Sequence, residues 1–166
     1  MENKNTTRNQ DFKTEIICDV KRSETEIYRI SRKEYKGRHF MDLRIFFRSK
    51  NDRDRLVPTH KGISIAEEIR QEVIVGLINA RKASAVTKPE GEKVHSVTIC
   101  EIPVSETETF RISKGCGSKN AFVDIRCFFK KGNGCFPSKR KGVSITESCL
   151  DDVITGLMRT EPACVS

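Results

Sequence analysis

The residues best suited to do chemistry in this sequence are two clusters of Lys and Arg. The first cluster, from Arg48 to Lys61, has five basic residues against two aspartates, a net charge of +3. The second, from Lys130 to Lys141, has five basic residues and no acidic one, a net charge of +5. Together they equal the formal net charge of the chain, +8 at pH 7, so the remaining sequence is neutral overall. A charge run is usually a solvated loop, but two matching runs favour contact with a polyanion.

Aromatic residues accompany both clusters. A single-stranded nucleic acid is bound by a basic groove and by rings on which bases stack, each worth about 1–3 kcal/mol. A duplex reader instead inserts base-reading side chains into the major groove. We expect most of the rings to be buried and one or two in each copy to be exposed. The strand-forming segments contain Phe40, Phe46, Phe47, Phe122, Phe128 and Phe129, whereas Tyr35 and Phe136 are expected in loops.

An internal duplication explains why the clusters match. Matching blocks occur in the same order in both halves of the chain, which two unrelated segments would not share. Residue 18 and blocks 23–26, 28–31 and 42–48 recur 82 positions later, and blocks 61–65 and 73–77 recur 80 positions later. The deletion of two residues therefore falls between 49 and 60, inside the first basic cluster. A half of this size buries little apolar surface, so we expect the two halves to pack together.

Each copy reads as strands followed by one helix. Apolar alternation and β-branched residues predict strands, and apolar residues at helical spacing predict one helix per copy. Thr146 is placed to cap the second helix, with acidic residues near its positive end, whereas Ala66 cannot cap the first. The predicted strands are 15–20, 27–32 and 39–48 in the first copy and 97–102, 109–114 and 121–130 in the second, and the third strand of each copy is the longest. A short fourth strand is predicted over 61–65, and the chain enters it through the basic loop.

The predicted fold class is therefore α+β, built from tandem ββββα repeats whose helices pack at a pseudo-dimer interface. Within each copy the helical stripe runs over residues 69–78 and 149–158. The expected organisation is a disordered tail over 1–11, a first repeat over 12–80, a linker over 81–93, a second repeat over 94–159 and a C-terminal tail over 160–166.

Several function classes are disfavoured by the composition. Seven Cys without a Cys-x-x-Cys motif, and only three His, predict free and mostly buried thiols rather than a zinc site. No nucleophile–base pair or phosphate-cradling Gly loop recurs in both copies, so we expect neither an enzyme nor a cofactor. No long apolar run or signal-like N-terminus is present, so we expect no membrane association and an intracellular location, the nucleus in a eukaryote and otherwise the cytoplasm.

The order of these blocks resembles the positive cofactor 4 transcriptional coactivator family, in its C-terminal single-strand-binding domain. The resemblance covers nearly all of both repeats. Its residues are Tyr35-Lys-Gly37, Asp42-Leu-Arg-Ile-Phe-Phe47 and His60-Lys-Gly-Ile-Ser-Ile65, with Asp124-Ile-Arg-Cys-Phe-Phe129 and Arg140-Lys-Gly-Val-Ser-Ile145 in the second copy. The resemblance implies a homodimeric fold with two curved, antiparallel four-stranded sheets and two channels for single-stranded DNA. The duplication would place both protomers in one chain.

The resemblance also implies roles for individual residues. The family's strand Arg matches Arg44 and Arg126, and its stacking Trp matches Phe47 and Phe129. Its basic loop pair matches His60-Lys61 and Arg140-Lys141, and its turn aromatic matches Tyr35.

Two departures from the family pattern affect the expected site. Gly117 replaces the turn aromatic in the second copy, and His60, largely neutral at pH 7, replaces a basic residue in the first. The first repeat would then bind more by stacking and the second more by charge. If Arg44 and Phe47 both contact the nucleic acid, their strand must bend or end near Phe46, since alternation places them on opposite faces.

The leading hypothesis is largely sequence-independent binding of single-stranded DNA in a transcription coactivator-like or DNA-maintenance role. RNA or melted duplex bound at the same surface, and an interaction scaffold for transcription-machinery proteins, are the alternatives. The chain is expected to be monomeric, with an internal pseudo-dimer. The expected nucleic-acid-binding residues are Tyr35, Lys36, Arg38, Arg44, Phe47, Arg48, Lys50, Arg53, Arg55, His60, Lys61, Arg126, Phe129, Lys130, Lys131, Lys139, Arg140 and Lys141.

Overall fold

A computed structural model describes residues 12–159, so the two predicted tails lie outside the described residues. Each repeat contributes four strands, a single 3₁₀ turn and one helix, in that order. In the first repeat these are β1 (Phe12–Lys21), β2 (Glu26–Tyr35), β3 (Arg38–Arg48), β4 (Leu56–Ala66), the turn Glu67–Ile69 and α1 (Arg70–Lys82). In the second they are β5 (His95–Pro103), β6 (Glu108–Cys116), β7 (Ala121–Lys131), β8 (Gly134–Thr146), the turn Glu147–Cys149 and α2 (Leu150–Met158). The predicted ββββα repeats are confirmed.

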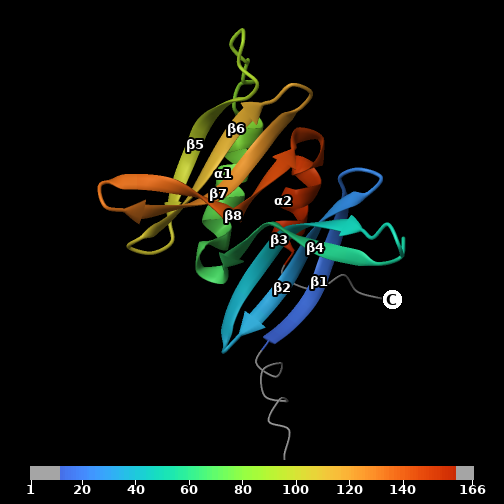
Figure 1. The fold of residues 1–166 in the computed structure, drawn as a ribbon. Coiled ribbons are helices and arrows are strands. Elements are labelled where there is room, and N and C mark those ends of the chain that lie inside the picture. Colours follow the sequence, from blue (N-terminus) through green and yellow to red (C-terminus); the bar gives the residue numbers. More distant parts are fainter. Residues whose placement is uncertain (1–11, 160–166) are drawn as a thin grey trace, which may run out of the picture.

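The two antiparallel four-stranded units join edge to edge. The strand order is β1-β2-β3-β4-β8-β7-β6-β5, so the fourth strands of the two repeats meet at the centre. They pair in parallel at a single position, where Gly62 lies opposite Lys141. Figure 1 shows the β3–β4 hairpin projecting to the right and the β7–β8 hairpin to the left. The duplication therefore yields two similar hairpins that point in opposite directions.

One hydrophobic core extends through both repeats. Leu43 and Ile125, at equivalent places in β3 and β7, are both fully buried in it. The core also includes Leu77 of α1 and Leu157 of α2, which come from the predicted helical stripes. A buried Val, Leu or Ile side chain contributes about 1.5–3 kcal/mol, so a core drawn from both halves supplies what one half lacks.

Each helix packs against the sheet of the other repeat. A Cβ atom added at Gly76 of α1 would lie 2.6 Å from Ile112 Cδ1 of β6, and one at Gly156 of α2 would lie 2.5 Å from Ile30 Cδ1 of β2. The sulfur atoms of two cysteines, Cys100 of β5 and Cys18 of β1, lie almost as close to these positions, at 2.8 Å and 2.6 Å. The glycines thus allow the helices to approach the opposite sheets closely, and the predicted pseudo-dimer interface is confirmed.

Two details of the sequence prediction were wrong. The fourth strand is not short, because β4 has 11 residues and β8, with 13, is the longest of the described strands. The segment expected to be a basic loop therefore lies partly in β structure, where residues 56–58 pair with residues 46–48. Thr146 makes no side-chain cap, and its hydroxyl oxygen lies 3.4 Å from the Tyr28 hydroxyl instead.

The six cysteines within residues 12–159 are free thiols, as predicted, and Cys164 lies outside the described residues. Five of the six are buried or partly buried, and Cys135 is exposed. Burial raises the pKa of the thiols of Cys18, Cys100 and Cys127 above its usual value, which disfavours the reactive thiolate form.

The described residues contain neither a cluster suited to a metal nor a membrane-spanning helix. No group of three or more His, Cys, Asp or Glu side chains in this part of the chain is placed to hold a metal ion. Both described helices are too short to cross a bilayer.

Candidate nucleic-acid interface

The Asp-x-Arg motif and the Lys-Gly-x-Ser motif form one structural unit in each repeat. Arg44 donates to both carboxylate oxygens of Asp42 at 3.2 Å, and the Ser64 hydroxyl donates to the same carboxylate at 2.8 Å. In the second repeat, Arg126 and Ser144 bind Asp124 in the same way. The sequence motifs recur together because they meet across neighbouring strands.

Each of these arginines also holds a bulge in the fourth strand. The pairing of β3 with β4 shifts register between Arg44 and Phe46, and the pairing of β7 with β8 shifts between Arg126 and Phe128. Arg44 donates to the carbonyl oxygen of Thr59 at 3.0 Å, inside the extra residues of β4. A bulge of this kind bends and twists the strand pair locally. In each repeat the irregularity lies between the motif Arg and the exposed Phe of the third strand.

Most of the predicted site residues are on the surface. All of them are exposed except Arg44 and Arg126, whose side chains are partly buried against the sheet. The structure divides the exposed ones into separate groups. We define the first hairpin surface as Phe47, Arg48, Lys50, Arg53, Arg55, His60 and Lys61, and the second hairpin surface as Phe129, Lys130, Lys131, Phe136 and Lys139.

The second hairpin surface contains a pair of neighbouring aromatic rings. Phe129 of β7 lies opposite Phe136 of β8, with ring centroids 6.2 Å apart. The two residues are 37% and 48% exposed. Phe136, expected in a loop, lies in a strand and was missing from the predicted site. In the first repeat the equivalent pair is Phe47 and Val57, so this surface has one exposed ring where the second has two.

The phenylalanines next to these rings in the same strands are covered by arginines. The Arg29 guanidinium lies 4.7 Å from the centroid of the Phe46 ring, and that of Arg111 lies 3.8 Å from the centroid of the Phe128 ring. Phe46 and Phe128 are only partly exposed. These rings are therefore less open to a stacking partner than the rings of the two hairpin surfaces.

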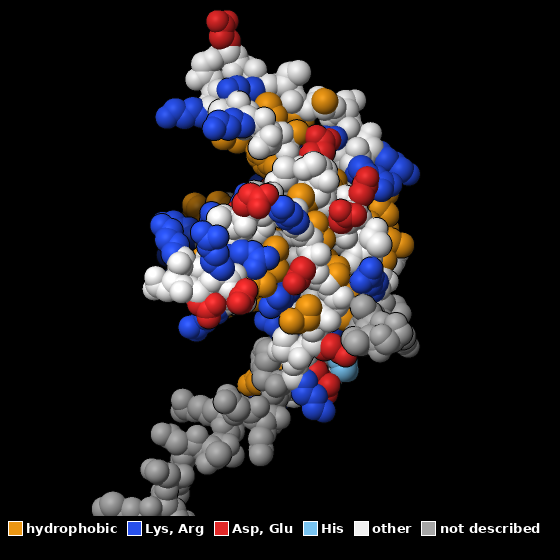
Figure 2. Space-filling model, turned by 90° about the vertical axis from the view of Figure 1, so that its right-hand side faces the viewer, with side chains coloured by type: hydrophobic (Ala, Val, Ile, Leu, Met, Phe, Trp, Pro, Cys, Tyr) orange, Lys and Arg blue, Asp and Glu red, His pale blue; other side chains and the backbone are white. Residues whose placement is uncertain are grey.

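Basic side chains surround the hairpin rings. In the first hairpin, Arg48 donates to the carbonyl oxygen of Arg53 at 3.1 Å, which holds the tip of the hairpin together. Figure 2 views the side on which this hairpin projects and shows Lys and Arg gathered beside a hollow, with acidic side chains close by. In the second hairpin, none of Lys130, Lys131 or Lys139 has an ion-pair partner among residues 12–159.

Tyr35 lies far from the first hairpin surface. Expected in a loop, it ends β2, and the turn after it has positive φ at both Lys36 (49°) and Gly37 (75°), as tight hairpin turns require. Tyr35 pairs with Arg38 at the start of β3, whereas Phe47 is near the end of that strand. At about 3.3 Å per residue the two rings are roughly 30 Å apart along the strand, so they cannot stack on adjacent bases.

A groove between the repeats brings together residues from both copies. Arg38 and Arg44 of the first repeat and Arg140 and Lys141 of the second line a space of about 420 Å³. Lys141 donates to Glu108 at 2.9 Å, and this hydrogen bond raises the pKa of the lysine. The groove was not foreseen from the sequence, because its residues are far apart in the chain and belong to different predicted channels.

Comparisons with known proteins point to a single family. A family model described as Transcriptional Coactivator p15 (PC4) matches residues 23–74. Two crystal structures of a PC4 homologue from Burkholderia pseudomallei K96243, in orthorhombic and tetragonal forms, are 37% identical to the chain, each with a TM-score of 0.39. The matches cover 42% of this chain and 92% and 100% of those chains, respectively. No curated protein matches the chain at a significant level.

Proposed function

This chain belongs to the Transcriptional Coactivator p15 (PC4) family, and we propose that it binds single-stranded DNA, largely without regard to sequence, through its two hairpin surfaces. One observation carries the proposal most strongly. The exposed rings of Phe129 and Phe136 lie in a hairpin whose lysines have no acidic partner among the described residues. Rings next to unpaired positive charge are what a flexible single strand needs.

The two kinds of contact have separate roles. Phosphate groups neutralised by Lys and Arg release counterions, which gives affinity without sequence preference and makes it fall with salt. Bases stacked on Phe side chains add about 1–3 kcal/mol each and require unpaired bases, since a duplex keeps its bases stacked inside. The charge therefore attracts any polyanion, and the rings select single strands.

A role resembling that of a transcription coactivator, or a role in DNA maintenance, follows from this proposal. Either role would use binding to single-stranded segments, and the first would also involve proteins of the transcription machinery. The family assignment supports this proposal. Binding through the outward-facing hairpins would leave the helices free of nucleic-acid contact.

A competition experiment tests the proposed function. A labelled single strand of about 20 nucleotides is bound to the protein, and this length exceeds most single-module binding sites. Unlabelled single-stranded DNA, duplex DNA or RNA of the same sequence then competes for the protein. We expect the single strand to compete at least about 10-fold better than the duplex, as the loss of one or two stacked bases would produce. Equal competition by the duplex would reject the proposal, and better competition by RNA would transfer it to RNA.

A charge variant tests the surface itself. Replacing Lys130, Lys131 and Lys139 with Gln should lower the slope of log affinity against log salt by roughly 2, at about 0.7 per phosphate contact in single strands. The matched control replaces Lys82, Lys88 and Lys93, exposed lysines outside both hairpins, and removes the same charge. Equal effects of the two variants would show that the second hairpin has no special role.

A further inference from the structure

The repeats create two equivalent positions for an inter-repeat groove, and the side chains of the described residues fill these two positions differently. The open groove is the space of about 420 Å³ lined mainly by residues of β3 and β4 on one side and of β6 and β8 on the other. By the offset of the duplication, its lining residues Val104 and Phe110 correspond to Arg22 and Tyr28 on the opposite side. We call that opposite position the closed groove.

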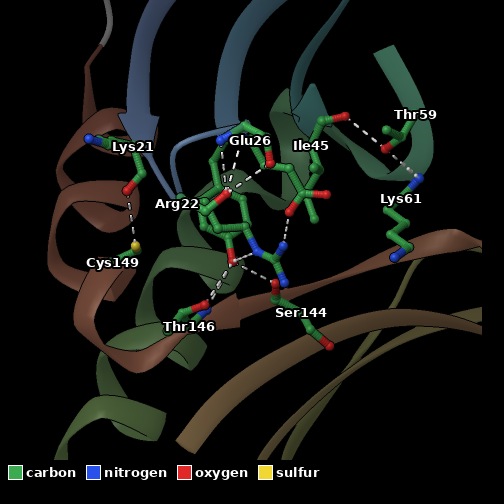
Figure 3. A network of polar contacts seen from close by, with 12 residues as sticks. Lys21, Arg22, Glu26, Ile45, Thr59, Lys61, Ser144, Thr146 and Cys149 are labelled. Atoms are coloured by element: carbon green, nitrogen blue, oxygen red, sulfur yellow. Dashed lines mark hydrogen bonds and ion pairs between the residues drawn. The ribbon is translucent and has the colours of Figure 1, made fainter. Parts of the chain in front are cut away.

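A hydrogen-bonded network fills the closed groove. The Tyr28 hydroxyl donates to the carbonyl oxygen of Ser144 at 2.9 Å and accepts the backbone N–H of Thr146 at 3.0 Å. Arg22 donates to the same hydroxyl at 3.1 Å and forms an ion pair with Glu26. Figure 3 shows Arg22, Glu26, Ser144 and Thr146 converging here from both repeats. Tyr28 is fully buried at this position.

The open groove cannot form this network. Phe110 has no hydroxyl to reach across to β4, and Val104 has no guanidinium to bind one. Glu108, the counterpart of Glu26, pairs with Lys141 instead of with an arginine. The space that Arg22 helps to fill on one side therefore remains available on the other.

The two grooves also differ in the charged residues that line them. Arg38 and Arg140 line the open groove, and their counterparts by the offsets of the duplication are Asn120 and His60. The closed groove therefore has Asn and His where the open groove has two Arg, whereas its additional Arg22 is paired with Glu26. Among the described residues, the Arg140 side chain has no partner, and the Arg38 guanidinium lies 5.2 Å from the centroid of the Phe40 ring. An exposed Arg with free donors is suited to bidentate contact with phosphate.

We propose that a bound single strand crosses from the first repeat to the second through the open groove alone, with its phosphates against Arg38 and Arg140. This inference rests on the proposed function, and it makes the two sides of the molecule unequal. The volume of about 420 Å³ lies in the range of pockets that hold small organic ligands, about 300–1,000 Å³. A strand too short to reach both repeats would not use the groove.

Variants that copy the closed groove into the open one test this proposal. Arg38→Asn with Arg140→His gives the open groove the residues of its counterpart. The matched control, Lys88→Asn with Lys93→His, removes the same charge from the segment between α1 and β5. Affinity is measured for strands of about 20 and about 8 nucleotides, chosen to span both repeats or one. We expect the groove variant to bind the long strand at least about 10-fold more weakly than the control does, because it loses charge-assisted hydrogen bonds to phosphate. Both variants should bind the short strand equally well.

A second variant fills the open groove and adds positive charge to it, whereas the first variant removes positive charge. Val104→Arg with Phe110→Tyr supplies the two side chains that fill the closed groove and adds one positive charge. If the groove carries the strand, this variant binds the long strand more weakly despite its added charge. Wild-type binding of the long strand with no selective loss in either variant would overturn the groove proposal and leave the proposed function intact. Absence of wild-type binding to both strands would reject the proposed function itself.

Discussion

The side chain of Arg44 lies directly against Gly62, where a Cβ atom would come within 2.7 Å of the guanidinium carbon and within 2.9 Å of Arg44 Cβ. Arg126 and Gly142 repeat this contact in the second copy. The glycine of the Lys-Gly-x-Ser motif is therefore required by the arginine of the neighbouring strand. This pairing fixes the bulge beside which the basic residues lie.

Replacing Gly62 with Ala should destabilise the fold by about 1–3 kcal/mol, the usual cost of overpacking, because the clash involves the base of the Arg44 side chain as well as its end. Urea unfolding measures the change. Gly117→Ala is the matched control, since a Cβ there would meet only a carbonyl oxygen at 3.9 Å. Equal stability of the two variants would show that Arg44 moves aside without cost.

Replacing Asp42 with Asn should cost roughly 3 kcal/mol or more, because it leaves the partly buried Arg44 guanidinium without its carboxylate. Asp124→Asn should cost less, since the Asp124 side chain is 18% exposed and that of Asp42 only 3%. Thermal unfolding compares the two variants. The opposite order of stability would contradict the assignment of Asp42 as the more deeply buried centre.

Replacing Gly156 with Ala tests the crossed helix packing. In an exposed helix this change would stabilise by up to about 1 kcal/mol, but here the added methyl meets Ile30 and Cys18 of the other repeat. We expect a loss of about 1–3 kcal/mol instead. Thr155→Ala, at the exposed neighbouring position, controls for helix propensity. A stabilising effect at both positions would mean that α2 does not approach β1 and β2 closely.

The duplication made much of this fold predictable from sequence. It defined two modules and placed the helices by their apolar stripes. It could not show that each helix covers the other sheet, because both stripes are alike and either sheet offers an apolar face. The lengths of β4 and β8 were missed because Pro58, Pro137 and several basic residues interrupt the apolar alternation.

The candidate site was predictable in composition but not in arrangement. The basic and aromatic residues stood out by type, whereas Phe136 was missed because the deletion near it obscures its counterpart, Val57. The difference between Tyr28 and Phe110 is visible when the copies are aligned. Its consequence depends on which strand each ring faces across the repeats, and this is a property of the topology.

Replacing Phe136 with Val gives the second hairpin the residue found at the equivalent place in the first. We expect single-stranded DNA to bind at least about 5-fold more weakly, since the loss of one stacked base costs about 1–3 kcal/mol. Fluorescence anisotropy of a labelled strand measures the change. The converse variant, Val57→Phe, should strengthen binding, and an unchanged affinity in both variants would argue that these positions do not stack on bases.

The most direct test of base stacking uses a tryptophan in place of Phe129. The chain contains no Trp, so the emission of this variant reports on a single position. Stacking of bases on the indole ring should quench this emission as single-stranded DNA is added, and duplex DNA at the same concentration should quench it much less. Unchanged emission at saturation, while the anisotropy of a labelled strand shows that it is bound, would contradict the proposed interface.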